Sequence, residues 1–188
     1  GTCRRLRAGE NPGANLGIIL GTLARAGRDK AVFLMSAALQ DFGAWVEQLL
    51  AESTGKDGRG ILPIVRPTAA SATQPAGDRL TVAIGLAGDT ALAASVNQAR
   101  ERGEPVISMT LEDPIEIGAQ FFLWEFATAA AGAVLGINPF DQPNVALSKK
   151  KTEAALNIFM KSRTFPEESS TWEEETLAFY GEKREVGL

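Results

Sequence analysis

Apolar residues occur along the chain in two kinds of run. The short runs are continuous and bounded by Gly, Pro, Asp or charged residues, which is typical of strands buried on both faces of a sheet. The longer runs repeat apolar residues three and four positions apart, which predicts helices. The expected strands are 30–36, 60–65, 80–86 and 105–111, and the expected helices are 14–26, 39–53, 89–102, 115–135 and 149–161.

The alternation of strands and helices predicts the fold class, an α/β domain with a doubly wound parallel sheet flanked by helices. Gly27 is expected to end the first helix, and Gly55 is expected to cap the second in the left-handed conformation. Residues 66–78 are rich in Ala, Pro, Ser and Thr and predict a surface loop.

The apolar periodicity is lost after Arg163, where the sequence becomes acidic. We therefore expect an α/β domain over 1–163 and an acidic extension over 164–188, with a short helix over 172–180. No internal repeat is visible.

Composition excludes several classes of protein. A chain of 188 residues with 45% apolar and 22% charged residues is the size of one globular domain. Its net charge of −4 and the absence of a long basic block argue against nucleic acid as a partner. The apolar stretch 121–135 is too short for a membrane span and contains Glu125. One cysteine fits a cytoplasmic location. The chain does not begin with Met, so we expect a piece of a longer protein.

The chain contains no histidine, which restricts the chemistry that it can perform. Ser-His-Asp and Cys-His catalysis and imidazole metal ligands are excluded within this sequence. No dense Asp/Asn loop resembles a calcium site, and neither a metal nor another cofactor is expected. Acid–base work must fall to carboxylates, to lysines or to another chain.

Glu52 stands in the last turn of the helix predicted over 39–53, where the carbonyl ends of the helix disfavour a carboxylate by up to about 1 kcal/mol. The same field makes the carboxylate a better proton acceptor. Gln48 lies four residues earlier and projects from the same face. A base beside an amide suits proton abstraction from a polar substrate. The alternative is a frayed and solvated helix end.

Other polar features leave two interpretations open. Residues 85–89 (Gly-Leu-Ala-Gly-Asp) follow a strand and open a helix, as phosphate loops do, but without dinucleotide spacing a tight turn is favoured. Residues 53–56 (Ser-Thr-Gly-Lys) look like the end of a phosphate loop, but a helix C-terminus repels anions. Lysines 149–151 form a solvated helix face, or one of them turns inward and acts as a general acid or an anion clamp. Gln120 and Glu125, on an otherwise apolar helix, are structural or functional.

Two motifs of the chain resemble those of one enzyme family. The first is residues 136–143 (Gly-Ile-Asn-Pro-Phe-Asp-Gln-Pro), with Val145 and Lys149 after them, and the second is residues 48–56 (Gln-Leu-Leu-Ala-Glu-Ser-Thr-Gly-Lys). The first is similar to the C-terminal signature of the glucose-6-phosphate isomerase family, and the second is similar to that family's Gln-x-x-x-Glu-Ser-x-Gly-Lys motif. The resemblance covers about 11–159. Residues 11–20 and 121–142 look like the branch in which this isomerase is fused behind a transaldolase.

The resemblance implies a role for each matching residue. Glu52 matches the base that moves a proton between C1 and C2 of the open-chain sugar through a cis-enediol. Gln48 and Gln142 match glutamines at the sugar-phosphate pocket, and Lys149 matches a lysine that assists ring opening. Gln120 takes the place of the family's ring-opening histidine. The reaction that is implied interconverts glucose 6-phosphate and fructose 6-phosphate without a metal or redox cofactor.

The sequence departs from the family at three places. Gln120 cannot exchange protons as imidazole does, so ring opening must rely on Lys149, water or another chain. The lysine motif has become Asn-Val-Ala-Leu-Ser-Lys, with Lys150 and Lys151 adjacent to Lys149. The family's phosphate-binding loop and active-site arginine would precede residue 11, and this chain lacks them.

We therefore expect the second sugar-isomerase domain of a longer enzyme, with an upstream isomerase domain and a transaldolase domain as partners in the same polypeptide. The isolated chain is expected to turn over little or nothing. The alternatives are a non-catalytic sugar-phosphate-binding domain and an oligomerisation module, such as a homodimer formed through the apolar helix 115–135.

Overall fold

The structure is a computed structural model that describes residues 10–65, 67, 77–165 and 169–181. The chain divides into two compact units, Gly1–Gln142 and Pro143–Leu188. Sequence analysis placed a boundary at Arg163, whereas in the structure the segment from Pro143 onward groups with the C-terminal residues. Most of the surface loop expected over 66–78 lies outside the described residues.

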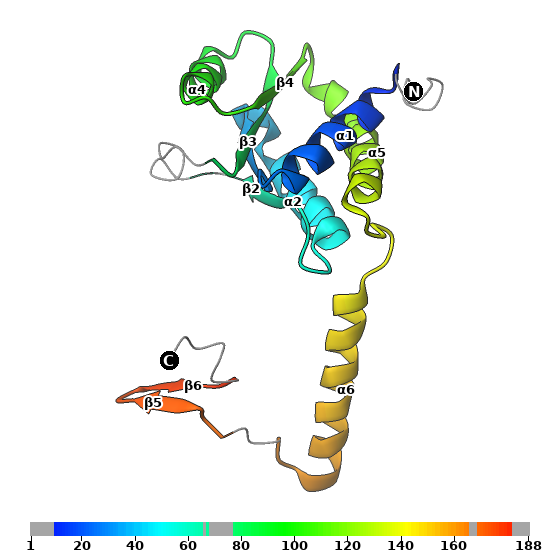
Figure 1. Cartoon of the computed structure of the whole chain (residues 1–188), viewed down its shortest axis with the longest axis vertical. Coiled ribbons are helices and arrows are strands. Elements are labelled where there is room, and N and C mark those ends of the chain that lie inside the picture. Colours follow the sequence, from blue (N-terminus) through cyan, green and yellow to red (C-terminus); the bar gives the residue numbers. More distant parts are fainter. Residues whose placement is uncertain (1–9, 66, 68–76, 166–168, 182–188) are drawn as a thin grey trace. The chain divides into compact units, whose positions relative to one another are not determined.

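A four-stranded parallel sheet forms the centre of the first unit. Its strands are β1 (Lys30–Met35), β2 (Leu62–Val65), β3 (Arg79–Leu86) and β4 (Val106–Leu111), in the order β2-β1-β3-β4 (Figure 1). Lys30 pairs with Leu62 on one side and with Arg79 on the other. The four strands lie within one residue or two of the predicted apolar runs, and the predicted α/β class with a parallel sheet is confirmed.

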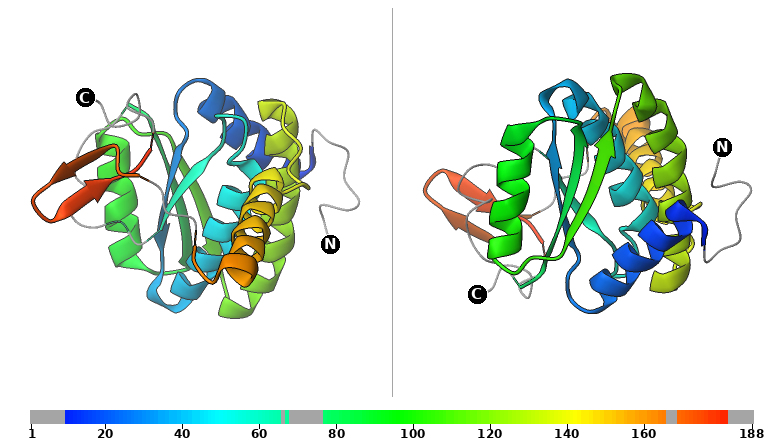
Figure 2. Two further views of the ribbon diagram at one scale, coloured as in Figure 1. Left: turned by 90° about the horizontal axis from the view of Figure 1, so that it is seen from below. Right: turned by 90° about the horizontal axis from the view of Figure 1, so that it is seen from above.

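The chain leaves β1 toward one edge of the sheet and β3 toward the other edge. Right-handed crossovers then place the two connecting helices on opposite faces. Accordingly, α2 (Gln40–Thr54), which follows the short turn η3 (Ala37–Leu39), covers one face, and α4 (Thr90–Glu101) covers the other (Figure 2). After the turn η4 (Pro114–Glu116), α5 (Ile117–Leu135) packs beside α2, and α1 (Pro12–Arg25) packs along α5.

One apolar core joins the sheet to the helices on the α2 face. At its centre the ring of Trp124 on α5 lies 5.3 Å from the ring of Phe33 on β1, and both side chains are buried. Other fully buried members come from β3, α1 and α2: Leu80, Val82, Ile84, Leu20, Val46 and Leu50. One face of α5 is buried in this core, but Phe121, Phe122 and Phe126 on the same helix are exposed. The sequence predicts a central helix because α5 is apolar nearly all round, whereas in the structure only one of its faces is covered.

The contact between α1 and α5 depends on glycines at four-residue spacing on α1. A Cβ atom on Gly17 would lie 2.2 Å from the carbonyl oxygen of Ala127, and a Cβ atom on Gly21 would lie 2.8 Å from the side chain of Val134. Both distances are shorter than van der Waals contact, so the two helices approach closely only because these positions lack side chains.

The apolar stretch at α5 is longer than the stretch 121–135 that the sequence suggested. Among the described residues, one stretch, Pro114–Leu135, is long and apolar enough to cross a membrane, with a mean hydropathy of 1.2. The helix packs against α1 and α2, and 33% of its apolar window is buried inside the protein.

Glycines end α1 and α2 in different ways. Gly27 follows α1 with a φ of 87°, as expected for a left-handed stop. Gly55 caps α2 with a φ of −75°, so the predicted left-handed cap is wrong. The left-handed residues lie two positions later, at Asp57 (φ 55°) and Gly58 (φ 67°). They form the tight turn between the paired residues Lys56 and Arg59.

The second unit contains one long helix and a small hairpin. Helix α6 (Pro143–Ser162) begins six residues before the predicted start at 149, with proline in the favoured first position. The prediction of a short helix over 172–180 is wrong. Strands β5 (Trp172–Glu174) and β6 (Leu177–Phe179) form an antiparallel pair there instead. The rings of Trp172 and Phe179 contact each other across the pair at 5.1 Å, which favours the hairpin.

Candidate functional site

Glu52 lies in the last turn of α2 with an exposed side chain. The opposite face of α2 carries the buried residues Val46 and Leu50, which pack into the core and fix the rotation of the helix. The helix end is held by Thr54, whose buried hydroxyl donates to the carbonyl of Leu50 (2.7 Å) and accepts from the amide of Ile61 (2.9 Å). Glu52 therefore projects from a hydrogen-bonded helix end toward solvent.

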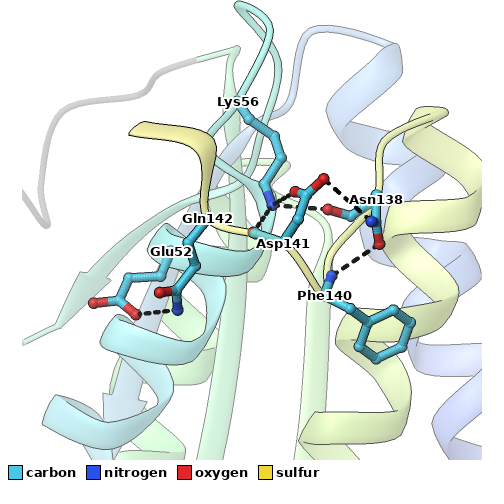
Figure 3. Close-up of polar contacts among 6 residues, drawn as sticks. All are labelled: Glu52, Lys56, Asn138, Phe140, Asp141 and Gln142. Atoms are coloured by element: carbon cyan, nitrogen blue, oxygen red, sulfur yellow. Dashed lines mark hydrogen bonds and ion pairs between the residues drawn. The ribbon is translucent and has the colours of Figure 1, made fainter. Parts of the chain in front are cut away.

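Two amide groups hold the two carboxylate oxygens of Glu52. The Nε2 of Gln48, one turn earlier on α2, donates to Oε1 at 3.3 Å. The Nε2 of Gln142 donates to Oε2 at 3.2 Å from the segment that follows α5 (Figure 3). The structure thus brings together three of the five predicted site residues. A carboxylate held by two neutral donors has a defined orientation and keeps lone pairs open to a substrate.

The segment that carries Gln142 is attached to α2 by Lys56. The side chain of Lys56 is 4% exposed, and its Nζ donates to the carbonyl of Asn138 (2.7 Å), to the carbonyl of Asp141 and to Oδ1 of Asp141 (2.8 Å). The Nδ2 of Asn138 donates to the other carboxylate oxygen of Asp141 at 3.1 Å (Figure 3). The hydrogen bond from Lys56 is the main reason why the pKa of Asp141 is below its ordinary value.

The start of this segment is fixed at the end of α5. Gly136 caps α5 with a φ of 72°, a conformation that favours glycine. The guanidinium of Arg59 donates to the carbonyl of Leu135 at 2.7 Å, and so satisfies one of the open carbonyls at this helix end. The amide of Phe140 donates to Oδ1 of Asn138 at 3.1 Å, which folds the segment back on itself.

Gln120 lies at the other end of α5, away from Glu52. Its neighbour Phe121 contacts Phe42 and Trp45 near the start of α2, with ring centroids 5.1 Å and 4.5 Å apart. Glu52 comes ten residues after Phe42, about 15 Å further along the helix axis. Gln120 is buried, and its Oε1 has no hydrogen-bond partner within the described part of the chain. The structure does not bring Gln120 to Glu52.

Lys149 belongs to α6 in the second unit and has an exposed side chain. Its role in the site stays a prediction from the motif.

The sheet has a second region where its topology would place a ligand. Strands β1 and β3 are neighbours whose crossovers leave in opposite directions, and ligands of doubly wound sheets bind beyond the carboxyl ends of such strands. There the hydroxyl of Ser36 donates to Oδ2 of Asp89 at 2.6 Å, and the amide of Leu92 donates to Oδ1 of Asp89 at 2.9 Å. Asp89 caps α4, and these polar groups are engaged in structural contacts.

Glu52 is therefore at the opposite end of the sheet from that region, because α2 runs antiparallel to the strands. A cavity of about 940 Å³ lies between the ends of α1, α2 and α5 and is lined by Ala51, Gly55 and Arg59, among others, whereas Glu52, Gln48 and Gln142 do not line it. A smaller cavity of about 380 Å³ lies between α4 and β4. The larger cavity adjoins the helix end that carries Glu52.

Sequence analysis quoted Lys56 and Asp141 within motifs but gave neither a role. Their contacts join residues 82 and 85 positions apart in the chain, and no periodicity reports such a contact. The one signal in the sequence is the motif itself, in which Lys56 is a matching position.

Comparison with known proteins gives relatives of one kind. No protein-family model matches the chain. A protein of Symbiobacterium thermophilum named glucose-6-phosphate isomerase is 30% identical over 156 residues, which is 63% of this chain and 35% of the relative. Proteins of the same name from Leptospira interrogans (29%, covering 64% of this chain and 36% of the relative) and Bacillus cereus (26%, covering 78% and 41%) are also similar. The chain spans well under half the length of the curated relatives it matches.

Solved structures show the same fold. A hypothetical protein from Thermus thermophilus superposes with a TM-score of 0.67 at 20% identity, over 82% of this chain and 47% of that one. A glucose-6-phosphate isomerase from Chlamydia trachomatis superposes with a TM-score of 0.59 at 18% identity, over 81% of this chain and 39% of that one. At these identities the superposition describes the fold alone.

Proposed function

We propose that this chain is the C-terminal sugar-isomerase domain of an aldose–ketose isomerase that interconverts glucose 6-phosphate and fructose 6-phosphate. The observation that carries the proposal is the Glu52 carboxylate, exposed at a helix end and held at both oxygens by Gln48 and Gln142. The similarity to proteins named glucose-6-phosphate isomerase supports the same reaction.

In the proposed reaction Glu52 acts as the base on the open-chain sugar. It removes the proton from C2 of the aldose, the electron pair of that bond forms the C1–C2 double bond, and the carbonyl pair moves to O1, which takes up a proton to give the cis-enediol. Glu52 then returns its proton to C1 while O2 releases its proton and becomes the ketone oxygen. The proton lost by O2 replaces the one taken up by O1, so that no atom or electron is gained or lost overall. Gln48 and Gln142 orient the carboxylate toward the two carbons, and positioning of this kind supplies much of the rate.

The sugar ring must open before this step, and we assign assistance at the ring oxygen to Lys149. Gln120 is proposed to contact the substrate as a hydrogen-bond donor or acceptor, because an amide does not exchange protons at neutral pH. Its distance from Glu52 along the helices requires that Gln120 act at a different part of the ligand, or from another copy of the chain.

The remaining parts of the enzyme are proposed to lie in the same longer polypeptide. They are an upstream isomerase domain that binds the phosphate group of the sugar and a transaldolase domain that precedes it. The proposal includes a cytoplasmic location and no metal, nucleic-acid or membrane partner. The isolated chain then carries the base but binds the phosphate poorly.

The test replaces Glu52 by glutamine in the complete polypeptide that the gene encodes. Isomerisation of fructose 6-phosphate is expected to fall by about 10²- to 10⁴-fold in kcat, with KM within a few-fold, because only the proton transfer is removed. Incorporation of solvent deuterium into the sugar, followed by NMR, should be lost in parallel. The matched control is Glu47→Gln, which removes the same charge from the exposed face of the same helix.

Retained turnover in Glu52→Gln would show that another group is the base. Equal losses in both variants would point to the charge of α2 rather than to Glu52. Activity of the isolated chain near that of the complete polypeptide would refute the proposed division of the site between two domains.

A further inference from the structure

We infer that Lys56 and Asp141 are positioning residues that hold the Gln142 amide against the Glu52 carboxylate. The catalytic meaning of this pair rests on the proposed function, whereas its effect on Gln142 does not. The two residues carry no role in the motifs that identified Glu52, and neither contacts Glu52 directly.

The Lys56 ammonium group is nearly excluded from water and donates to three oxygens, all from residues 138–141. An ammonium group has three protons to donate, so its capacity is used in full. An incoming phosphate group cannot reach it, which excludes an anion-binding role for the Ser-Thr-Gly-Lys segment.

These hydrogen bonds act on the backbone next to Gln142. Two of the three oxygens belong to Asp141, and one of those is the carbonyl of the peptide group that leads into Gln142. Pro143 follows and restricts the backbone of Gln142 to extended conformations. The Lys56 contacts therefore fix the backbone next to the amide that binds Glu52, although Gln142 itself is exposed.

Net stability does not account for the hydrogen bonds of Lys56. Burying an ion pair often gives little net stability, because the desolvation of the charges offsets their attraction. The same turn is already joined to the end of α5 by Arg59, which donates to the carbonyl of Leu135. Lys56 makes a contribution that Arg59 does not make. It fixes the position of residues 138–141 relative to the end of α2, and this position determines where Gln142 lies.

The experiment follows the side-chain amide resonances of Gln48 and Gln142 by ¹⁵N NMR in the full chain, from about pH 3 to about pH 8. The part of each titration that Glu52 causes is identified by its loss in Glu52→Gln. In the unaltered chain both amides are expected to follow Glu52. In Lys56→Met the response of Gln142 is expected to be lost, while that of Gln48 remains, because Gln48 shares a helix with Glu52.

Two further variants keep the test decisive. Arg59→Met is the matched control, since it removes a cation and a carbonyl contact from the same turn without touching residues 138–141, and should leave the Gln142 response unchanged. Asp141→Ala serves if Lys56→Met does not fold. It removes an exposed carboxylate and should reduce the Gln142 response, with the backbone carbonyls left to Lys56. A Gln142 response of full amplitude in Lys56→Met, or in Asp141→Ala when the former is unfolded, would overturn the inference.

Activity of the complete polypeptide gives an independent result. Lys56→Met is expected to lower kcat by about 10- to 100-fold with a smaller change in KM, as misplacement of a catalytic contact does. Loss of the Gln142 response in a polypeptide without isomerase activity would support the positioning pair and refute the proposed function. If the Gln142 response is retained in Lys56→Met and isomerisation by the unaltered polypeptide depends on Glu52, the proposed function is supported and the positioning pair is refuted.

Discussion

Lys56 and Glu52 lie four residues apart in the chain, but the Lys56 side chain is buried and the Glu52 side chain is exposed. Lys56 follows the cap of α2 and is covered by residues 138–141, whereas Glu52 is exposed and accepts hydrogen bonds from two side-chain amides. A cation that is removed from water needs a full set of acceptors, and the carbonyls of Asn138 and Asp141 supply most of that set. The buried residue therefore determines where the exposed residue finds its second partner.

The carboxylate of Asp141 should make the stability of the first unit depend on pH. Its pKa is lowered in the folded state, chiefly by the hydrogen bond from Lys56. A lowered pKa means that the stabilisation is present above the unfolded value of about 3.9 and is lost as the pH falls through the folded value. We expect Asp141→Asn to lower Tm at pH 7, and we expect the difference from the unaltered chain to shrink below about pH 4.

Thermal unfolding followed by circular dichroism at a series of pH values measures this difference directly. Asp78, Asp89 and Glu104 also have lowered pKa values, so the acid destabilisation of the unaltered chain is shared among several groups. The comparison of the two proteins isolates Asp141. A difference in Tm that stays constant down to pH 3 would contradict the assigned contact.

At this scale sequence reasoning worked for contacts along one helix and failed for contacts between segments. The spacing of Gln48 and Glu52 placed both side chains on one face, where they are hydrogen-bonded. The contact of Glu52 with Gln142 spans 90 residues, and the motifs suggested it only through the family resemblance. The roles of all five predicted residues stay predictions.

Among the elements, the packing of α1 on α5 shows how a small sequence feature controls a large contact. Gly13, Gly17 and Gly21 lie on one face of α1, and the side chains or backbone of α5 fill the space beside them. In an isolated helix each glycine costs up to about 1 kcal/mol relative to alanine. The close approach of the two helices must more than offset that cost.

Gly17→Ala is expected to destabilise the first unit by about 1–3 kcal/mol, because the added methyl group would overlap the backbone of Ala127. For a domain of this size the corresponding loss in Tm is roughly 2–4 °C per kcal/mol. Gly118→Ala is the matched control. Gly118 also lies in a helix, but nothing lies within 4 Å of an added Cβ atom there.

The control variant should be neutral or slightly more stable, since alanine favours helix. Thermal or denaturant unfolding of both variants measures the contrast. Equal effects of the two substitutions would show that helix propensity, rather than the contact between α1 and α5, governs the result.

The elements that sequence analysis misplaced share a physical cause. The segment 172–180 has polar residues that fit either a helix or a strand, and the ring contact of Trp172 with Phe179 favours the hairpin. Gly55 was expected to be left-handed, but the chain turns at Asp57 and Gly58 instead. In both segments a pairing across a tight turn, which apolar periodicity does not report, goes with the observed backbone conformation.

For the molecule as a whole, the distribution of buried side chains differs between the two units. The first unit contains the entire apolar core of the described residues, whereas α6, β5 and β6 have no buried residue. A single helix and a two-stranded hairpin without a core are marginally stable in water. The stability of the chain should therefore reside in the first unit.

A chain that ends at Gln142 is expected to unfold in one cooperative transition, as judged by circular dichroism, whereas a peptide of residues 143–188 should melt gradually. The matched control ends at Leu135 and lacks the segment that binds Lys56. It should be less stable than the chain ending at Gln142 by at least about 1–3 kcal/mol, because a buried ammonium group loses its acceptors. Equal stability of the two truncated chains would contradict the contribution of that segment.

The sequence by itself determined most of the elements and the fold class. Apolar periodicity depends on neighbours within one or two turns, so it predicted the four strands, the helices α1, α2, α4 and α5, and the parallel sheet. The i, i+4 spacing placed Gln48 beside Glu52 for the same reason.

Only the tertiary structure decided what stands at the end of α2. The carbonyls that bind Lys56, the amide that reaches Glu52 and the helix that separates Gln120 from it come from distant parts of the chain. Such contacts form when packing brings α5 and the segment after it beside α2. Because that packing depends on the shape of the whole core, no local pattern in the sequence contains it.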